Sequence, residues 1–94
     1  MPYILVQHSV KDYDKWKAVF DGQEATRRAD GSKGGFVLRS ADDPNRITVL
    51  LGWDNMENAR AFAGSDDLRE AMQRAGVMGP PNVYFLDEAD RPSV

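Results

Sequence analysis

The order in which two hydrophobic periodicities follow one another constrains this chain more than any other feature. Segments rich in β-branched and aromatic residues indicate strands, and apolar residues three and four positions apart indicate helices. The predicted elements are strands at 3–10, 36–40, 46–53 and 82–87 and helices over about 12–31 and 54–76, the second broken at Gly64-Ser65. The Pro80-Pro81 pair precedes the last strand and favours extended chain there.

This order of elements is that of the split βαβ, or ferredoxin-like, arrangement. The sequence therefore predicts an α+β fold in which two helices lie on one face of a four-stranded antiparallel sheet. The turn residues at 42–45 favour a hairpin between the second and third strands. Residues 1–88 are expected to form a single domain, and the polar residues 89–94 a flexible C-terminal tail.

Polar residues are predicted to start the helices. Asp12 can cap the first helix through its carboxylate, and Asp54 begins a capping-box pattern before the second. Ser65 or Asp66 is expected to cap the part that follows the break. Gly22 lies inside the first predicted helix, where glycine costs about 1 kcal/mol relative to alanine.

The predicted strands carry large apolar residues on both faces. Because strand side chains alternate, the first strand divides into two sets, Ile4, Val6, His8 and Val10 against Tyr3, Leu5, Gln7 and Ser9. The strands at 46–53 and 82–87 have the same two-sided character. A sheet covered by helices on one face alone would expose a large apolar patch, which soluble proteins avoid. We therefore expect a homodimer in which two copies pack sheet to sheet.

Composition excludes several classes of function. The net charge is −3 and the basic residues are scattered, whereas nucleic-acid binding needs clustered lysine and arginine. No cysteine is present, so a disulfide framework, a thiolate nucleophile and a cysteine-based metal site are excluded. No stretch approaches the roughly 20 apolar residues of a membrane span. We expect a cytoplasmic protein with no nucleic-acid or membrane partner.

His8 is the candidate catalytic residue. It is the only histidine in the chain, and histidine is the side chain whose ordinary pKa lies near neutrality, which suits acid–base catalysis. Its neighbours on the predicted strand are apolar. The alternative is a half-buried sheet residue that is hydrogen-bonded to backbone or to the partner chain.

Two polar residues continue the apolar stripe of the first predicted helix. Gln23 and Arg27 follow Trp16 and Phe20 at spacings of three and four, so they share the face that should meet the sheet. Polar groups there must be paired. Both are candidate substrate-binding residues, with Arg27 holding an anionic or enolate oxygen. The alternative is that the helix splays from the sheet and Arg27 reaches solvent.

Two aromatic residues with polar tips are further substrate-binding candidates. Trp53 ends the third predicted strand and Tyr84 lies on the last. Either could orient a planar substrate by stacking and one hydrogen bond. The alternative is that they belong to the core or to the dimer interface. Trp16, Phe20 and Phe62 are expected to be core residues.

Five segments carry a family resemblance: 10–16 (VKDYDKW), 29–34 (ADGSKG), 42–45 (DDPN), 52–54 (GWD) and 65–68 (SDDL). With these motifs the chain resembles the dimeric α/β-barrel superfamily, and within it the antibiotic biosynthesis monooxygenase-like (ABM-like) proteins. The resemblance extends over nearly the whole chain. It implies a ferredoxin-like fold whose dimer forms an α/β barrel, and a cofactor-independent monooxygenase, cyclase or isomerase acting on a small hydrophobic or aromatic, polyketide-like substrate.

Two positions depart from the activities known in the superfamily. Val49 stands where the similar cofactor-free oxygenases have an asparagine, four residues before the matching Trp53, and valine cannot hydrogen-bond an oxyanion. Met72 stands where the haem-degrading members have an axial histidine.

The residues support two functional hypotheses. The first is an enzyme with a pocket between sheet and helices, in which His8 is the acid–base and Arg27, Gln23 or Tyr84 stabilises an oxyanion. The second is a non-catalytic dimeric module that binds a small ligand or a partner protein. A cavity lined by these residues would favour the first hypothesis, and collapsed packing around His8 and Gln23 the second. No cofactor is expected, and a metal site is not expected from one histidine per chain.

Overall fold

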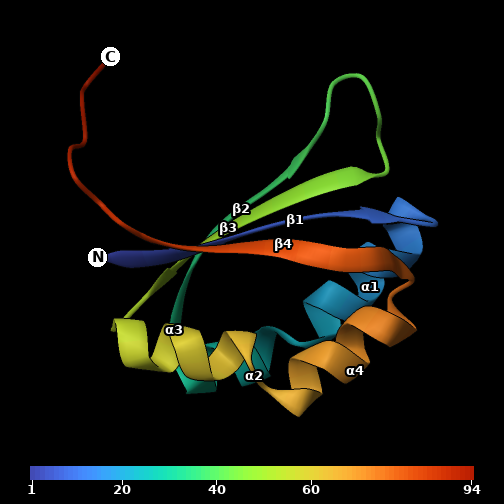
Figure 1. The fold of residues 1–94 in the computed structure, drawn as a ribbon, viewed down its shortest axis with the longest axis horizontal. Coiled ribbons are helices and arrows are strands. Elements are labelled where there is room, and N and C mark those ends of the chain that lie inside the picture. The colour runs from blue at the N-terminus through green and yellow to red at the C-terminus, as the bar shows by residue number, and fades with distance from the viewer.

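The computed structural model describes residues 1–94 as one sheet with a layer of helices. The elements are β1 (Pro2–Val10), α1 (Tyr13–Gly22), α2 (Glu24–Asp30), β2 (Ser32–Arg39), β3 (Arg46–Trp53), α3 (Met56–Ala63), α4 (Asp66–Arg74) and β4 (Val77–Asp87). The strands form an antiparallel sheet in the order β2-β3-β1-β4, and all four helices lie on one side of it (Figure 1). The predicted ferredoxin-like fold is confirmed, with each predicted helix formed as two.

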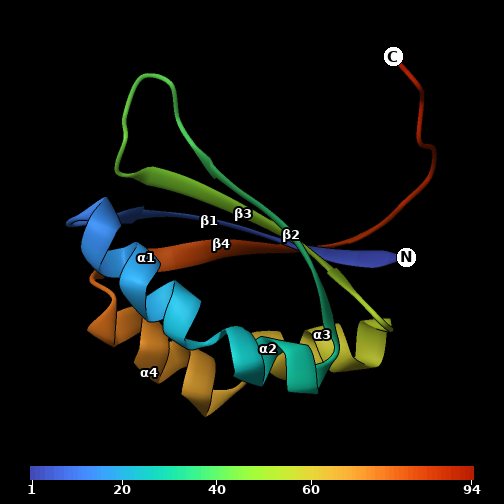
Figure 2. The ribbon, with the colours of Figure 1, turned by 180° about the vertical axis from the view of Figure 1, so that it is seen from behind.

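The helix layer has two rows. Figure 2 shows α1 continuing into α2 along one side, with α4 and α3 behind them, and the packing contacts pair α1 with α4 and α2 with α3. The aromatic rings of this layer pack closely. Trp16 stacks on Phe20 with ring centroids 5.0 Å apart, and Trp53, at the end of β3, packs on Phe62 of α3 at 4.8 Å.

The covered face of the sheet is built from alternate residues of the two central strands, as the alternation predicted. The pairs across β1 and β3 on this face are Ile4 with Leu51, Val6 with Val49 and His8 with Ile47. All of these side chains are buried. Because burying one aliphatic side chain stabilises a fold by about 1.5–3 kcal/mol, this face supplies most of the core.

The first helical segment is broken where one continuous helix was expected. Gln23, with φ −96° and ψ 4°, separates α1 from α2, and Gly22 is the last residue of α1. A Cβ at Gly22 would meet no atom within 4 Å, so packing does not require glycine, and its low helix propensity accounts for the break. The second segment breaks at Gly64 as expected, and the Ser65 hydroxyl accepts a hydrogen bond from the Leu68 amide.

The two other predicted caps are wrong. Asp12 occupies the N-cap position of α1, but its side chain makes no capping hydrogen bond. The cap of α3 is Asn55, whose side-chain oxygen accepts from the Asn58 amide at 2.8 Å. The Asp54 carboxylate instead accepts from the Asn55 amide at 2.7 Å. Asp54 and Asn55 are both able to cap a helix, and Asn55, the second of them, is the N-cap of α3.

β2 begins four residues earlier than expected. It starts at Ser32 and not at Phe36, and its pairing with β3 is irregular between Ser32 and Gly34. Gly34 has a φ of 86°, a conformation that costs glycine little. Gly35 lies so close to β3 that a Cβ there would stand 1.8 Å from the Leu50 carbonyl oxygen. The two glycines therefore bring this end of β2 onto the sheet.

β4 also begins earlier than expected, at Val77 and not at Asn82. It includes Pro80-Pro81 because it is an edge strand, whose outer side needs no backbone donors. Its pairing with β1 shifts register between Gln7 and Ser9.

The opposite face of the sheet is bare of helices (Figures 1 and 2). One row of paired residues crosses all four strands on this face, Phe36, Leu50, Leu5 and Tyr84. Phe36 is 64% exposed and Tyr84 50% exposed. The single chain thus leaves a broad apolar surface in water, as the two-sided strands predicted. We call this surface the bare face.

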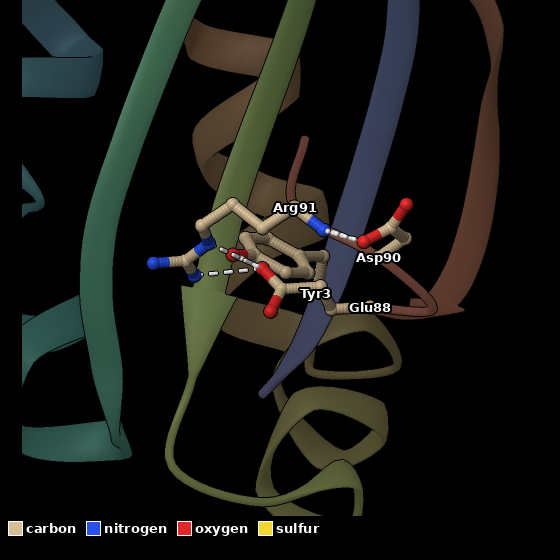
Figure 3. A network of polar contacts seen from close by, with 4 residues as sticks. All are labelled: Tyr3, Glu88, Asp90 and Arg91. Carbon is tan, nitrogen blue, oxygen red and sulfur yellow. Dashed lines mark hydrogen bonds and ion pairs between the residues drawn. The ribbon is translucent and has the colours of Figure 1, made fainter. Parts of the chain in front are cut away.

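The C-terminal segment folds back at the edge of the bare face. Figure 3 shows the Tyr3 hydroxyl donating to Glu88, whose carboxylate also accepts from the Arg91 guanidinium, at 3.2 Å and 2.7 Å respectively. The Arg91 amide donates to the Asp90 carboxylate at 2.8 Å. The Arg91 hydrogen bond holds the pKa of Glu88 below its usual value.

We predict opposite effects on stability for alanine at two glycines. Gly35→Ala places a methyl group against the Leu50 carbonyl and should lower the free energy of unfolding by about 1–3 kcal/mol, as overpacking does. Gly22→Ala extends a helix into open space and should raise it by up to about 1 kcal/mol. Urea unfolding of both variants measures the difference. An unchanged Gly35→Ala protein would contradict the close approach of β2 to β3.

Candidate functional site

A cavity of about 70 Å³ lies between the sheet and the helix layer. Its walls come from β1, β3 and all four helices, and most of the lining side chains are hydrophobic. The volume suffices for a few water molecules and is well below the roughly 300 Å³ of a typical ligand pocket. Three of the predicted site residues, His8, Gln23 and Arg27, line it together.

His8 reaches this cavity from β1. Its side chain is buried, with 3% exposed, and its Nδ1 atom has no hydrogen-bond partner. The ring meets the Trp16 ring edge-on at 5.6 Å. Burial lowers the pKa of His8 below its ordinary 6.5, and the positive charge of Arg46 lowers it further. The imidazole is therefore neutral at pH 7, and its Nδ1 is buried without a partner.

Arg27 enters the cavity from α2. Its side chain is buried, with 8% exposed, because it folds back over Phe20. The guanidinium carbon lies 3.7 Å from the centre of that ring, and Nη1 donates to the Phe20 carbonyl at 2.6 Å. Arg27 takes part in none of the four ion pairs of the chain. Burial lowers the pKa of Arg27, and the nearby Glu24 and Asp21 oppose this.

Gln23 lines the cavity from the junction of α1 and α2. Gln23 separates α1 from α2, and the inward-facing side of α1 is followed by the inward-facing side of α2. Gln23 and Arg27 therefore both line the cavity. The geometry that the spacing predicted is therefore present, although the helix is not continuous.

Trp53 and Tyr84 do not lie at this cavity. Trp53 is fully buried against Phe62, with its indole nitrogen lacking a hydrogen-bond partner. Tyr84 lies on the bare face, opposite Leu5 on the neighbouring strand. Within one chain the sheet separates Tyr84 from His8. The predicted substrate contacts of Trp53 and Tyr84 therefore stay predictions, and the cavity does not support them.

Several residues that were expected to be plain core, or were not considered, also line the cavity. Trp16, Phe20 and Phe62 form apolar walls. Ser65 and Asp67 lie at the start of α4. The predicted break at Gly64-Ser65 was the one signal for these two, because it placed the start of a helix here; Ser65 is half-buried and Asp67 is exposed.

The two positions that depart from superfamily activities both lie in the cavity wall. Val49 of β3 and Met72 of α4 are lining residues. Val49, at the position of the oxygenase asparagine, and Met72, at the position of the haem degraders' histidine, thus line the same cavity as His8. Here both are apolar, so Gln23, Arg27 and His8 are the long polar side chains of the interior.

No group of three or more histidine, cysteine, aspartate or glutamate side chains is arranged to hold a metal ion. No helix is long and apolar enough to cross a membrane.

Fold and cavity together define a small α+β protein with a largely apolar site between sheet and helices. The model of the antibiotic biosynthesis monooxygenase family matches residues 9–74, well over half of the chain. The chain belongs to that family. No curated protein matches the sequence.

Solved structures share the fold over almost the whole chain. SnoaB, a cofactor-independent oxygenase from Streptomyces nogalater, is 12% identical with a TM-score of 0.79, covering 99% of this chain and 97% of its own. A Bordetella bronchiseptica protein, provisionally described as an antibiotic biosynthesis monooxygenase, is 21% identical with a TM-score of 0.75, covering 94% and 96%. Rv0793 from Mycobacterium tuberculosis is 17% identical with a TM-score of 0.68, covering 99% and 100%. At these identities the likeness establishes the fold.

We predict that His8 makes stability depend on pH. Unfolded chains protonate this histidine below about pH 6.5, whereas the buried imidazole resists protonation because its pKa is lowered. The unfolded state then binds more protons, so the free energy of unfolding should fall as the pH drops below 6.5, by at most about 1.4 kcal/mol per pH unit. Above pH 6.5 this contribution is fully present.

Urea unfolding of the wild-type protein and a His8→Leu variant between pH 7.5 and 5 measures this dependence. The variant should lose less stability over that window. Parallel pH profiles for the two proteins would show that His8 titrates normally in the folded state.

Proposed function

We propose that this protein is a cofactor-independent monooxygenase, or a cyclase or isomerase, acting on a small hydrophobic or aromatic substrate. The observation that carries the proposal is that His8, a neutral ring whose Nδ1 has no hydrogen-bond partner, lines an apolar cavity together with the buried cation of Arg27. A neutral base can abstract a proton, and a cation that lines the same cavity can stabilise the negative charge left behind.

The proposed chemistry begins with one step. The neutral His8 ring takes a proton from an acidic C–H or a phenolic O–H of the bound substrate. The electron pair left behind is delocalised onto a substrate oxygen, and Arg27 with Gln23 stabilises the negative charge there. In an oxygenase the resulting carbanion would reduce dioxygen and form a C–O bond to it; the carbon-bound peroxide would take the proton from His8 and then lose water to leave a carbonyl group. In a cyclase the carbanion would attack a carbonyl carbon of the same molecule, and the alkoxide formed there would take the proton. His8 keeps the proton until product formation returns it.

The proposal assigns to Arg27 the role that an asparagine has in similar oxygenases. Val49 in this chain offers no donor. The Arg27 guanidinium carries several N–H groups, and only Nη1 has a recorded partner, the Phe20 carbonyl. The remaining donors are free to bond a developing oxyanion.

Substrate entry requires the cavity to enlarge from about 70 Å³ toward the volume of a typical pocket. The helix layer is suited to this because both of its rows are broken, one at Gln23 and the other at Gly64. We propose that α2 and α4 move outward on these breaks when substrate binds. Such gating is common in enzymes that exclude water.

A non-catalytic ligand-binding module is the second candidate. The observations that favour it are the small volume of the cavity and the Arg27 hydrogen bond to Phe20, which satisfies part of the guanidinium without a ligand. In that case the same cavity would bind a small hydrophobic molecule, and His8 would be a buried residue without a reaction to perform.

We also propose that the protein works as a homodimer whose two bare faces pack together as an α/β barrel. The row Phe36, Leu50, Leu5 and Tyr84 gives each copy a continuous apolar strip across the sheet. A two-fold axis through this strip would remove it from water in both copies. Trp16 and the cavity lie on the other side of the sheet and stay clear of this contact.

We predict that His8 and Arg27 are needed for proton abstraction. Deuterium exchange at the α-carbon of 1-tetralone, followed by proton NMR, reports this step without requiring the natural substrate. His8→Ala should slow the protein-catalysed exchange by about 100-fold or more, the range of general-base catalysis. Arg27→Gln should slow it by about 10- to 100-fold through loss of oxyanion stabilisation.

Arg60→Gln is the matched control, because Arg60 also stacks on an aromatic ring, that of Phe85 at 4.4 Å, but is not among the cavity residues. Its exchange rate should equal that of the wild type. Binding of 1-tetralone with no exchange above that of buffer would favour the non-catalytic module. Incorporation of ¹⁸O from ¹⁸O₂ when anthrone is oxidised to anthraquinone, at a rate above that in buffer and in the same set of variants, separates an oxygenase from a cyclase.

We predict that one charge on the bare face dissociates the dimer. Phe36→Lys places an ammonium group within the proposed contact, at its β2 end, where an unpaired buried charge costs several kcal/mol. Sedimentation at micromolar concentration should give a dimer for the wild type and a monomer for the variant. Ala61→Lys, at an exposed position of α3, should stay dimeric. A wild-type monomer would contradict the proposal.

A further inference from the structure

A second hollow lies outside the cavity, between α2 and the start of β2. This groove has a volume of about 480 Å³, and its charged lining residues are Arg27, Arg28, Lys33 and Glu24. We call it the basic groove. Three cations and one carboxylate line it, although the chain as a whole carries a net charge of −3. A local reversal of sign of this kind attracts anions.

Most of this positive charge lacks a partner. Glu24 pairs with Arg28 at 3.5 Å, on the exposed surface of α2. Lys33 and Arg27 take part in none of the ion pairs. The one acidic residue of the groove is thus engaged, and two cations stay free to meet an anion.

Of the two cations without an ion pair, Lys33 and Arg27, Arg27 gives the stronger argument for an anion site because it is buried. A buried cation is costly unless an opposite charge or hydrogen bonds compensate, and here one carbonyl, one aromatic ring and the nearby carboxylates of Glu24 and Asp21 compensate in part, with no ion pair to either carboxylate. Burial has already lowered its pKa, which is a measure of that cost. An anion in the groove would supply the missing charge, and a guanidinium can bind a carboxylate or a phosphate through two parallel hydrogen bonds.

The basic groove and the cavity share a wall. Phe20, Arg27 and Leu51 line both hollows. A molecule that extended from the cavity into the basic groove would therefore pass the Arg27 guanidinium. The floor of the groove is the edge strand β2, where Gly34 and Gly35 carry no side chain that could block it.

We propose that the basic groove binds the anionic group of an amphipathic ligand whose apolar part occupies the cavity. Arg27 and Lys33 hold the anion, which is a carboxylate, sulfonate or phosphate group. This inference rests on the proposed function, since the apolar part lies in the same cavity as His8. It restricts the substrates to acids whose negative charge lies at one end of an apolar, planar body.

A pair of dyes tests the need for the anionic group. 8-Anilino-1-naphthalenesulfonate and N-phenyl-1-naphthylamine have the same aromatic body, and only the first carries a sulfonate. The wild-type protein should bind the sulfonate at least about tenfold more tightly, the effect of one charge-assisted hydrogen bond or more. Fluorescence titration gives both dissociation constants, and amide shifts in ¹H–¹⁵N spectra locate the dyes.

Two variants assign the effect to the groove. Arg27→Gln should weaken sulfonate binding about tenfold, and Lys33→Gln about two- to fivefold, because Lys33 is exposed. Neither should weaken binding of the uncharged dye. Arg60→Gln is the control arginine and should bind both dyes as the wild type does. If Arg27→Gln does not fold, the Lys33→Gln variant alone tests whether the sulfonate binds in the basic groove.

The outcomes separate this inference from the proposed function. Equal binding of the two dyes, with amide shifts around the cavity, would overturn the anion site and leave the cavity intact. Amide shifts confined to the bare face for both dyes, with none around the cavity, would overturn both. Sulfonate binding that the two groove variants do not weaken would place the anion elsewhere and reject the proposed site.

Discussion

The alternation of side chains along the two central strands divides this protein into two unlike surfaces, and the rest of the structure depends on that division. Residues 4, 6, 8 and 10 of β1 meet the helices, and the residues between them form the bare face. A shift of one residue in register would exchange the two sets. It would turn His8 away from the cavity and bring Gln7 or Ser9 of the same strand toward it. The enclosed site and the proposed dimer contact are therefore two consequences of one register.

The covered side of the sheet holds two buried polar groups in apolar surroundings. His8 stands among aliphatic neighbours with an unpartnered nitrogen, and Arg27 is buried without a counter-ion. Each arrangement lowers stability by the desolvation of a polar or charged group. A chain selected for stability alone would place aliphatic residues at both positions. That both polar groups face one cavity is the reason to regard it as a site.

Sequence reasoning reached the features that depend on local periodicity. Alternation identified the covered face with His8, and helical spacing placed Gln23 and Arg27 with it. The features that it missed depend on contacts between distant segments. The approach of Gly35 to Leu50 and the inclusion of Pro80 in β4 follow from strand pairing, which no local pattern reveals. The basic groove was missed for the same reason, because Lys33 and Arg27 meet only when β2 begins at Ser32.

The proposed function depends on His8 being a neutral base in an apolar cavity. Because it is the only histidine, ¹⁵N NMR of a histidine-labelled sample gives one unambiguous pair of ring signals. The account predicts a neutral imidazole at pH 7 that titrates below 6.5, with ring signals that shift when an aromatic ligand enters the cavity. A ring that is protonated at pH 7, or that titrates at or above 6.5 and ignores the ligand, would contradict it.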